Sequence, residues 1–386
     1  MKETLAKFKE VYDRRYEIAK EWKGATKGKA IGYTGMYFPE EIVHAAGALP
    51  VAIFEESEEE PITLADKHLM VNSCELVRSA YNSLLKGELD FLDGLVIPLI
   101  CDQLRFFTEV YQEDHPLPFF HQIWLSYRRD VKSKDNLLSE LKRLKESLEA
   151  YLGPIIFPET LWESIQLYNE NRALLRRLYE LRRGKPGTMS AADLLKVIVS
   201  GMWMPKEEHN KLLNELIPKL EAAEALTDGK TRVILAGYPC CIPDERVLNL
   251  IEELGAVVVD DDFYVGGRYF ATDVKGDGDP MEALVDSFLN RPPDSITHEP
   301  THYLNVSSLE PDYADHLVNV VRKSKAKGII FLRVMYCDPF DFEFVWVKER
   351  LDNENIPYVS IITEHGPAPL EAIRTRVEAF LEMIKG

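Results

Sequence analysis

Residues 94–102 read Gly-Leu-Val-Ile-Pro-Leu-Ile-Cys-Asp, a short apolar run that stops at a cysteine and an aspartate. The pattern returns at residues 328–338, where a glycine and a longer, mostly apolar run again lead to Cys337-Asp338. A continuous apolar run of this kind is typical of a parallel strand buried on both faces, and Asp is a preferred residue at a helix start. Both stretches predict a buried strand that passes directly into a helix.

A second repeat precedes the first in the same order along the chain. Residues 29–48 and 233–256 both contain an apolar strand, a proline followed by two acidic residues, and a Gly-Ala pair at the close. Strand and helix patterns alternate around both repeats, which favours an α/β fold with parallel sheets covered by helices on both faces. From the repeat we infer a duplicated unit.

The chain has 386 residues, about the length of two α/β domains with a spacer between them. We place an N-terminal α/β domain at residues 1–155 and a C-terminal α/β domain at residues 229–386. Residues 156–228 are almost wholly helical in pattern, so they are expected to join the two domains as a helical spacer.

Three finer expectations concern the N-terminal domain. Residues 2–23 have the apolar spacing of one amphipathic helix, and residues 51–54 have the pattern of a strand. Asn72 and Glu75 are spaced as a capping box, which predicts a helix start that places Cys74 in the first turn.

Composition limits the partners. The 46 Lys and Arg residues against 64 Asp and Glu residues give a net charge of −18, which argues against nucleic acid or an anionic membrane as a partner. No apolar run approaches the roughly 18 residues that a spanning helix needs, and the first residues contain no apolar signal segment. We therefore expect a cytoplasmic protein.

The five cysteines do not form a secreted disulfide framework, because their number is odd and they are widely dispersed. Cys101 and Cys337 lie where a predicted strand ends and a helix begins, the edge at which open α/β sheets bind ligands. A helix N-terminus favours a thiolate, and its free N–H groups can donate to an anionic cluster. With Cys74, these cysteines are the set that a soft-metal or iron–sulfur site requires.

Alternatives to a cluster remain open at this stage. A zinc site favours closely paired ligands such as C-x₂-C, which the chain lacks. A cysteine nucleophile needs one thiol and a base, and thus leaves two cysteines unexplained, while any thiol can be a small buried hydrophobe. A cluster held by three dispersed cysteines, with one iron left for another ligand, fits the spacing best. For Cys240-Cys241, we expect one thiol to line the pocket and the other to pack in the core.

The other motifs in the sequence give weaker evidence about function. The chain has no G-x-G-x-x-G and no P-loop, so we expect it neither to hydrolyse ATP nor to bind a dinucleotide in the usual way. Residues 298–302 match H-E-x-x-H, but Pro300 lies between the histidines and predicts a loop. Residues 260–262, three aspartates, are expected to form a polar turn at a sheet edge. His365 follows a predicted strand and is a candidate for the substrate pocket.

Six short stretches carry a family resemblance: Pro39 to Pro50, Ile100-Cys101-Asp102, Tyr168 to Arg172, Glu207 to Asn210, Val259 to Asp262 and Cys337-Asp338-Pro339. Together they resemble the 2-hydroxyacyl-CoA dehydratase/benzoyl-CoA reductase family over nearly the full chain. Within that family the sequence is most similar to the smaller cluster-bearing (C or gamma) subunits of the ATP-dependent reductases.

The resemblance implies two Rossmann-like domains with a [4Fe-4S] cluster between them, held by Cys74, Cys101 and Cys337. The cluster is expected either alone or as part of a double-cubane cluster, with Cys240 lining the pocket. The implied partners are a related cluster-binding subunit in a heterodimer, ATP-hydrolysing activator subunits and an acyl-CoA substrate.

The implied function is the low-potential, one-electron reduction of an aromatic acyl-CoA by an iron–sulfur oxidoreductase subunit. A subunit of a radical 2-hydroxyacyl-CoA dehydratase, a double-cubane reductase or electron-transfer protein, and a non-catalytic relay or scaffold subunit are the alternatives. No proton donor can be identified from the sequence.

Overall fold

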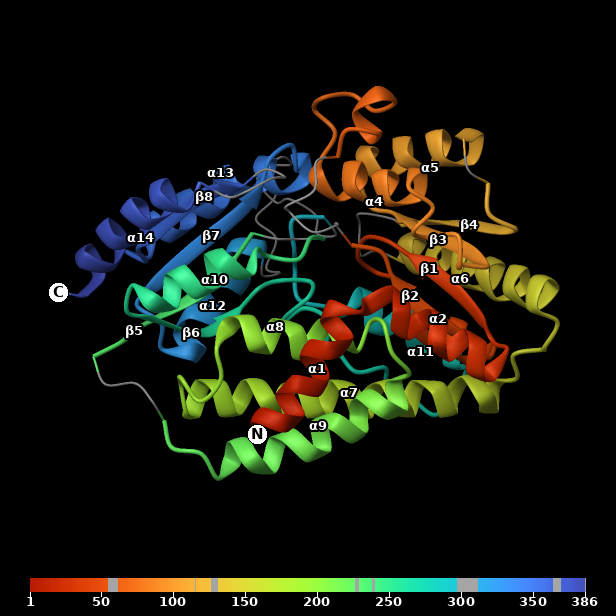
Figure 1. The fold of residues 1–386 in the computed structure, drawn as a ribbon, viewed down its shortest axis with the longest axis horizontal. Coiled ribbons are helices and arrows are strands. Elements are labelled where there is room, and N and C mark those ends of the chain that lie inside the picture. Colours follow the sequence, from red (N-terminus) through yellow and green to blue (C-terminus); the bar gives the residue numbers. More distant parts are fainter. Residues whose placement is uncertain are drawn as a thin grey trace.

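Two parallel sheets with one and the same strand order form the centre of the molecule. The computed structural model describes residues 1–54, 62–114, 116–125, 131–225, 229–237, 240–296, 312–363 and 369–385. The first sheet has the order β2-β1-β3-β4 and the second has the order β6-β5-β7-β8 (Figure 1). The strands are β1 (Lys29–Tyr33), β2 (Ala48–Ala52), β3 (Gly94–Leu99), β4 (Phe119–Trp124), β5 (Thr231–Ala236), β6 (Ala256–Asp261), β7 (Gly328–Val334) and β8 (Tyr358–Thr363).

The shared strand order confirms the predicted α/β fold with two Rossmann-like parallel sheets. The register repeats as well: Ile31 of β1 pairs with Gly94 of β3, and Val233 of β5 pairs with Gly328 of β7. In each sheet a glycine thus opens the strand that leads to a cysteine, as the internal repeat predicts.

These two glycines allow the neighbouring strand to approach. A Cβ atom on Gly94 would lie 2.7 Å from the Phe119 side chain at the start of β4. A Cβ atom on Gly328 would lie 2.6 Å from the Pro357 carbonyl oxygen, just before β8. Only glycine fits where backbones pass this closely, so the arrangement that the two halves share has a steric cause.

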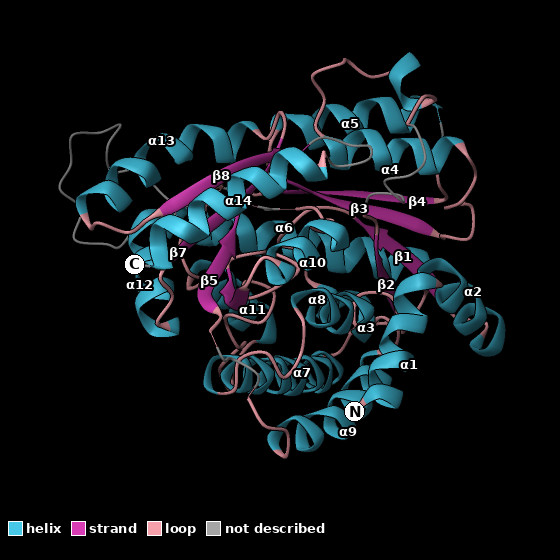
Figure 2. Cartoon of the chain, turned by 60° about the vertical axis from the view of Figure 1, so that its left-hand side comes forward, coloured by secondary structure: helices cyan, strands magenta, loops and turns pink. Residues whose placement is uncertain are grey.

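Helices cover both faces of each sheet and form a layer beneath them (Figures 1 and 2). Helices α4 and α5 lie on one face of the first sheet and α6 on the other; α12 and α13 lie on one face of the second sheet and α10 and α14 on the other. The helices are α1 (Lys2–Asp13), α2 (Arg15–Thr26), α3 (Glu40–Ala45), α4 (Glu75–Leu85), α5 (Asp102–Asp114), α6 (Val131–Leu152), α7 (Pro158–Gly184), α8 (Ala191–Ser200), α9 (Lys206–Glu221), α10 (Glu245–Glu253), α11 (Pro280–Leu289), α12 (Tyr313–Ser324), α13 (Asp338–Asn353) and α14 (Leu370–Lys385), with a short 3₁₀ turn at Ala65–Lys67.

The long helix α7 connects the two halves. It contacts α3 from the first half, and β6 and α11 from the second half, while α9 packs along it. Helix α11 also packs on α6 of the first half, where Lys134 and Asp286 form an ion pair at 2.6 Å. One hydrophobic cluster accordingly runs through both sheets and the helical layer, and a second lies between β5–β7 and helices α12 and α13. The domain boundaries at residues 155 and 228 stay a prediction.

Three finer expectations were wrong. Residues 2–23 form two helices rather than one, because the chain bends at Arg14, whose side chain binds Glu10 in α1 and Glu21 in α2. The second strand occupies residues 48–52 rather than 51–54. Helix α4 begins at Glu75 with Cys74 as its N-cap, so Asn72 precedes the helix and the predicted capping box does not form.

None of the described helices combines the length and the apolar character that crossing a membrane demands. The H-E-x-x-H stretch at 298–302 and His365 lie outside the described residues.

Candidate functional site

Three cysteines stand at the starts of three helices. Cys74 is the N-cap of α4 and Cys337 is the N-cap of α13, while Cys101 directly precedes α5. Cys101 follows β3 and Cys337 follows β7, so each comes from the carboxyl end of a central strand of its sheet. Tyr336, just before Cys337, has a φ of 64°, a left-handed conformation that is uncommon for a bulky residue. The chain thus turns sharply to bring this thiol to the helix.

Backbone amides of the first helical turns approach these sulfurs. Burial raises the pKa of all three thiols, and this increase is partly opposed by the N–H groups of Leu76 and Val77 at Cys74, of Gln103 and Leu104 at Cys101, and of Phe340 at Cys337. Cys74 and Cys337 are the N-caps of α4 and α13, and neither side chain makes a capping hydrogen bond. All three sulfurs therefore face the positive end of a helix.

The three thiols also act on one another. Burial raises the pKa of Cys74 to about 12, and the charge of Cys101 adds to the increase. Burial raises the pKa of Cys337 as well, with further contributions from Cys74 and Cys101. Like charges affect each other in this way only over short distances. The structure consequently brings together three thiols that are separated by up to 263 positions in the sequence.

The charges nearest to these thiols are negative. Besides the other cysteines, the charged side chains with the largest effects are Glu75 on Cys74, Asp102 and Asp338 on Cys101, and Asp341 on Cys337; all four effects raise the thiol pKa. A nucleophilic cysteine needs an electropositive environment. The acidic neighbours thus raise the thiol pKa values and do not activate any of the three cysteines as a nucleophile.

The donor set fits the [4Fe-4S] cluster that the family resemblance implies, because thiolates are the ligands of such clusters. Among the described residues, no three His, Cys, Asp or Glu side chains are grouped tightly enough to hold a single metal ion. A mononuclear zinc site needs sulfurs about 4 Å apart, given zinc–sulfur bonds of about 2.3 Å. A cluster spaces its ligands further apart, because each thiolate binds a different iron atom.

The vicinal cysteines separate in the structure. Cys240 is half-buried, and its pKa is raised by burial and then by Cys337, Cys101 and Cys74, so it lies with the other three. The Met36 amide, in the loop after β1, lowers the Cys240 pKa and therefore lies beside it. Cys241 is 3% exposed and packs in the hydrophobic core. One thiol of the pair thus packs in the core, as expected, while the assignment of Cys240 to a substrate pocket stays a prediction.

A buried polar network, which the sequence pattern does not reveal, lies behind the cysteines. Its centre is Glu40 at the start of α3, which accepts hydrogen bonds from Tyr33 at 3.1 Å and from Tyr269 at 2.5 Å. Lys206 donates to Tyr269 at 2.7 Å and lies 3.8 Å from the Glu40 carboxylate. The only sequence signal for this network was the pair of glutamates that enters an apolar segment at Ile42.

The neighbouring carboxylate pairs differently. Glu41 forms a buried ion pair with Arg172 of α7. Burial alone would raise the pKa of Glu41, but the charge and hydrogen bond of Arg172 outweigh it and lower the pKa overall. The two glutamates of α3 thus have separate partners, and both face the helical layer.

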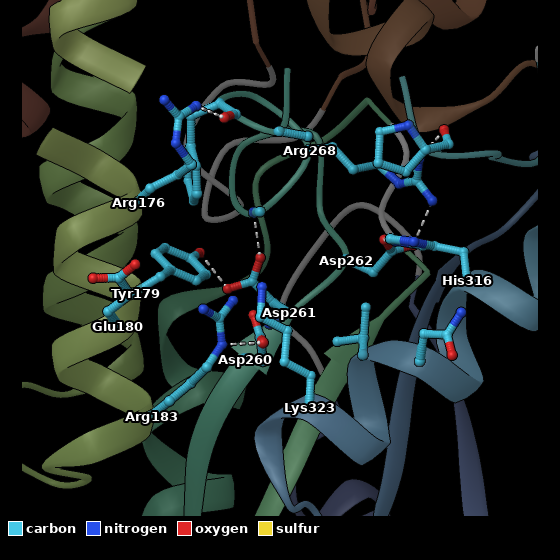
Figure 3. Close-up of a pocket in the computed structure, with 16 residues that line it drawn as sticks. Arg176, Tyr179, Glu180, Arg183, Asp260, Asp261, Asp262, Arg268, His316 and Lys323 are labelled. Atoms are coloured by element: carbon cyan, nitrogen blue, oxygen red, sulfur yellow. Dashed lines mark hydrogen bonds and ion pairs between the residues drawn. The ribbon is translucent and has the colours of Figure 1, made fainter. Parts of the chain in front are cut away.

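A cavity of about 330 Å³ lies elsewhere, between α7, the end of β6 and α12, and none of the cysteines lines it (Figure 3). Its aspartates are bound by cations: Asp260 by Arg183, Asp261 by Arg182, and Asp262 by Arg268 and His316. The carboxylates are therefore engaged in anchoring α7 and α12 to the sheet edge. Asp260 and Asp261 are the last residues of β6 and Asp262 directly follows it, so these aspartates end a buried strand and do not form the polar turn that we expected.

Comparison with known proteins gives a uniform result. The family model described as 2-hydroxyglutaryl-CoA dehydratase, D-component, matches residues 35–384. One of the benzoyl-CoA reductase subunits from Thauera aromatica is 30% identical, covering 99% of this chain and 98% of the relative. The (R)-phenyllactyl-CoA dehydratase beta subunit from Clostridium sporogenes is 27% identical over 98% of this chain and 97% of its own length. The beta subunit of (R)-2-hydroxyglutaryl-CoA dehydratase from Acidaminococcus fermentans is also 27% identical, covering 92% of each chain.

Proposed function

This chain belongs to the 2-hydroxyglutaryl-CoA dehydratase D-component family, and from that premise we propose that it is the iron–sulfur subunit of an enzyme that reduces an aromatic acyl-CoA in one-electron steps. The observation that carries the proposal is the meeting of the Cys74, Cys101 and Cys337 thiols at three helix starts.

The three thiolates would hold a [4Fe-4S] cluster, and the helix N-termini would offset their charge. Such a cluster, when bound, supplies low-potential electron transfer to a thioester-conjugated π system. The chain's own contribution is to hold the acyl group beside the cysteines, to exclude water, and to provide protons. Met36, in the loop after β1, lies with its amide beside Cys240, so these two residues would flank the acyl group next to the thiols.

The reductase assignment is supported by the 30% identity to a benzoyl-CoA reductase subunit over nearly the whole chain. Dehydration of a 2-hydroxyacyl-CoA is the second candidate, because two dehydratase beta subunits match over similar lengths at 27% identity. Both reactions use a CoA thioester, so the cysteine site and its pocket would serve either one. A double-cubane cluster is a further variant of the same site.

Partners follow from the same comparison. The relatives are named as subunits, which supports a related cluster-binding partner in a heterodimer. The chain has neither a P-loop nor G-x-G-x-x-G, which supports ATP hydrolysis in separate activator subunits. The net charge of −18 is unfavourable for anionic CoA, so basic residues of a partner would assist its binding in the cytoplasm.

Co-expression with the partner subunit and anaerobic purification test this function. We expect about four irons and four sulfides per cluster, as the cube stoichiometry requires. With the activator, ATP and a low-potential reductant, the complex should consume benzoyl-CoA, and addition of benzoyl-CoA should change the electron paramagnetic resonance spectrum of this chain's cluster. Turnover of an (R)-2-hydroxyacyl-CoA alone would favour the dehydratase. Absence of iron, or of turnover with either thioester, would contradict the proposal.

A further inference from the structure

The cavity at the carboxyl end of β6 has no role in the proposed function. It measures about 330 Å³, lies between α7, the end of β6 and α12, and has no cysteine among the residues that line it (Figure 3). Small-molecule sites begin at about 300 Å³, and open α/β sheets bind ligands beyond the carboxyl ends of their strands. The cavity thus has the size and the place of a site for a small ligand.

The two halves of the fold differ at this edge. Strand β2 holds the same place in the first sheet as β6 holds in the second. Ala52, the last residue of β2, donates its N–H to the Met202 carbonyl at 3.1 Å and accepts a hydrogen bond from the Trp203 indole at 2.8 Å. Trp203 is fully buried and closes this strand end with apolar surface. In the second half, charged side chains line an open space at the equivalent position.

The aspartates at the cavity are already engaged. Each carboxylate oxygen of Asp260, Asp261 and Asp262 has a partner at 2.5–3.1 Å. The partners are side chains of α7 and α12, one side chain of the loop after β6 and two backbone N–H groups: Tyr179, Arg182, Arg183, His316, Arg268, Asp261 and Gly267. A cationic ligand would have to displace these bonds, so the walls do not favour one.

Several donors at the cavity are unused within the described part of the chain. Arg183 uses only its Nε–H, which donates to Asp260 at 2.6 Å, so both terminal NH₂ groups are left. Lys323 forms no hydrogen bond or ion pair with a described residue, and neither does the side chain of Asn319, one turn earlier in α12. Figure 3 shows Arg183 entering from α7 and Lys323 from α12. Two cations with free N–H groups thus face one space, an arrangement that an anion neutralises.

We propose that this cavity binds a small organic phosphate, whose phosphate oxygens accept hydrogen bonds from Arg183 and Lys323. The guanidinium presents its N–H groups side by side, which matches a phosphate, and the ammonium adds a point charge. Phe270, Ala271 and Val320 supply apolar wall for the organic part of the ligand. Because the chain carries a net charge of −18, its overall field repels anions, and an anion is held only where cations converge.

This site goes beyond the proposed function and does not depend on a cluster. Arg183 belongs to α7, which connects the two halves, and Lys323 belongs to α12, which packs on the second sheet. A phosphate bound to both residues would tie the helical layer to that sheet and stabilise the folded chain by mass action. Two ligands share the required chemistry, a free adenine nucleotide and the nucleotide end of a CoA thioester, and the test separates them.

Isothermal titration calorimetry of the full chain, purified anaerobically with its partner subunit, tests the site with ADP, CoA and inorganic phosphate as separate probes. Lys323→Gln is the first variant, because Lys323 is exposed and bonds to no described residue, so the fold is kept. We expect it to weaken nucleotide binding by about 10- to 100-fold, the value of one hydrogen bond to a charged group. Lys211→Gln on α9 is the matched control: it removes the same charge from an exposed position that does not line the cavity, and it should bind as wild type does.

Arg183→Lys is the second variant. It keeps a positive charge beside Asp260 but removes the paired NH₂ groups, so we expect binding about 10-fold weaker than in wild type, with unchanged iron content. Wild type should bind inorganic phosphate more weakly than the nucleotide probe, because phosphate alone reaches no apolar wall. The melting temperature of wild type should rise with the nucleotide probe, and that of Lys323→Gln should rise less.

The outcomes separate the two ligands and the two proposals. If Lys323→Gln weakens the binding of CoA but not of ADP, the ligand is the thioester; if it weakens the binding of ADP, a free nucleotide suffices. If wild type binds none of the probes saturably, or Lys323→Gln binds all of them as wild type does, the phosphate site is wrong. Iron content and turnover of benzoyl-CoA are measured independently, so the proposed function stands or fails on those results.

Discussion

Cys74 and Cys337 are the N-caps of α4 and α13, two helices that pack on different sheets. Burial, and next the charge of Cys74, raise the pKa of the Cys337 thiol. One thiol therefore comes from each half of a duplicated fold, and Cys101 joins Cys74 from the first half. A cofactor bound by all three would join the halves at the carboxyl ends of their strands. This explains why a site of three cysteines is spread over most of the chain.

Each cysteine of the site should be required for iron. Cys74→Ala, Cys101→Ala or Cys337→Ala should each lose most of the iron and sulfide, because removal of one of three ligands exposes the cluster to solvent. Cys241→Ala is the matched control, since Cys241 is 3% exposed and packs in the core. Cys240→Ala should also keep its iron, because we assign Cys240 to the pocket wall. Iron and sulfide are measured after anaerobic purification. Equal iron in all five variants would remove the ligand assignment.

Breaking the Glu41–Arg172 ion pair should be costly. Side-chain exposure is 3% for Glu41 and 10% for Arg172, so Glu41→Gln would leave a buried guanidinium without its counter-charge. We expect the free energy of unfolding to fall by about 3–5 kcal/mol. Glu221→Gln is the control, because Glu221 pairs with Arg177 at 2.8 Å on the surface, and its loss should cost less than about 1 kcal/mol. Urea unfolding at pH 7 measures both values.

The stabilisation that the Glu41–Arg172 ion pair gives to the fold depends on pH. The pKa of folded Glu41 is lowered, so its stabilisation is complete above the ordinary glutamate pKa of about 4.3 and is lost as the pH falls through the lower folded value. The difference in stability between wild type and Glu41→Gln should therefore shrink below that pH. A difference that stays constant down to the acid transition would contradict the ion pair.

His209 should make the protein sensitive to mild acid. Its ring is buried and neutral: Nε2–H donates to the Val197 carbonyl at 2.8 Å, and Nδ1 accepts from the Asn171 amide at 2.7 Å. Burial, helped by the charge of Lys206, lowers the pKa of His209 to about 3. In the unfolded chain it is about 6.5, so the unfolded state binds the extra proton as the pH falls below that value.

The stabilisation by neutral His209 is thus complete above pH ~6.5 and declines toward pH ~3, by about 2 kcal/mol at pH 5. His209→Gln is expected to be less stable than wild type at pH 7, yet to lose about 2 kcal/mol less between pH 7 and pH 5. Urea unfolding followed by tryptophan fluorescence at both pH values measures the change. Identical losses in the two proteins would show that His209 is not a buried neutral histidine.

The order of strands and helices could be predicted because the pattern of apolar residues within each segment indicates whether it is a strand or a helix. The run after Gly94 is apolar throughout and the run after Gly328 is interrupted only by Arg333, and the structure buries nearly all of both strands. The first residue of α4 was harder to predict. The spacing of Asn72 and Glu75 satisfies a capping box, yet Cys74 is the N-cap of the helix. Local spacing gives the presence of a helix more safely than its first residue.

The places of Cys101 and Cys337 were predictable, because both cysteines follow repeated strands. The Glu40 network was not, because its partners lie far apart in sequence: Tyr269 is 229 positions from Glu40, and Lys206 is 63 positions from Tyr269. Periodicity relates only near neighbours and says nothing of contacts between a helix start and a distant loop. Only the folded chain brings these side chains to one place.

Gly94→Ala tests the steric basis of the duplicated sheets. The added Cβ would meet the Phe119 side chain at 2.7 Å and its carbonyl oxygen at 2.9 Å, so β3 and β4 would have to separate. We expect a loss of about 1–3 kcal/mol in the free energy of unfolding, the usual cost of overpacking, and a similar loss for Gly328→Ala in the second sheet. Gly24→Ala is the control, because its Cβ would have no neighbour within 4 Å and an alanine in helix α2 should stabilise by about 0.5–1 kcal/mol. If Gly94→Ala and Gly24→Ala both raise the melting temperature, the strands are not packed as closely as the shared register requires.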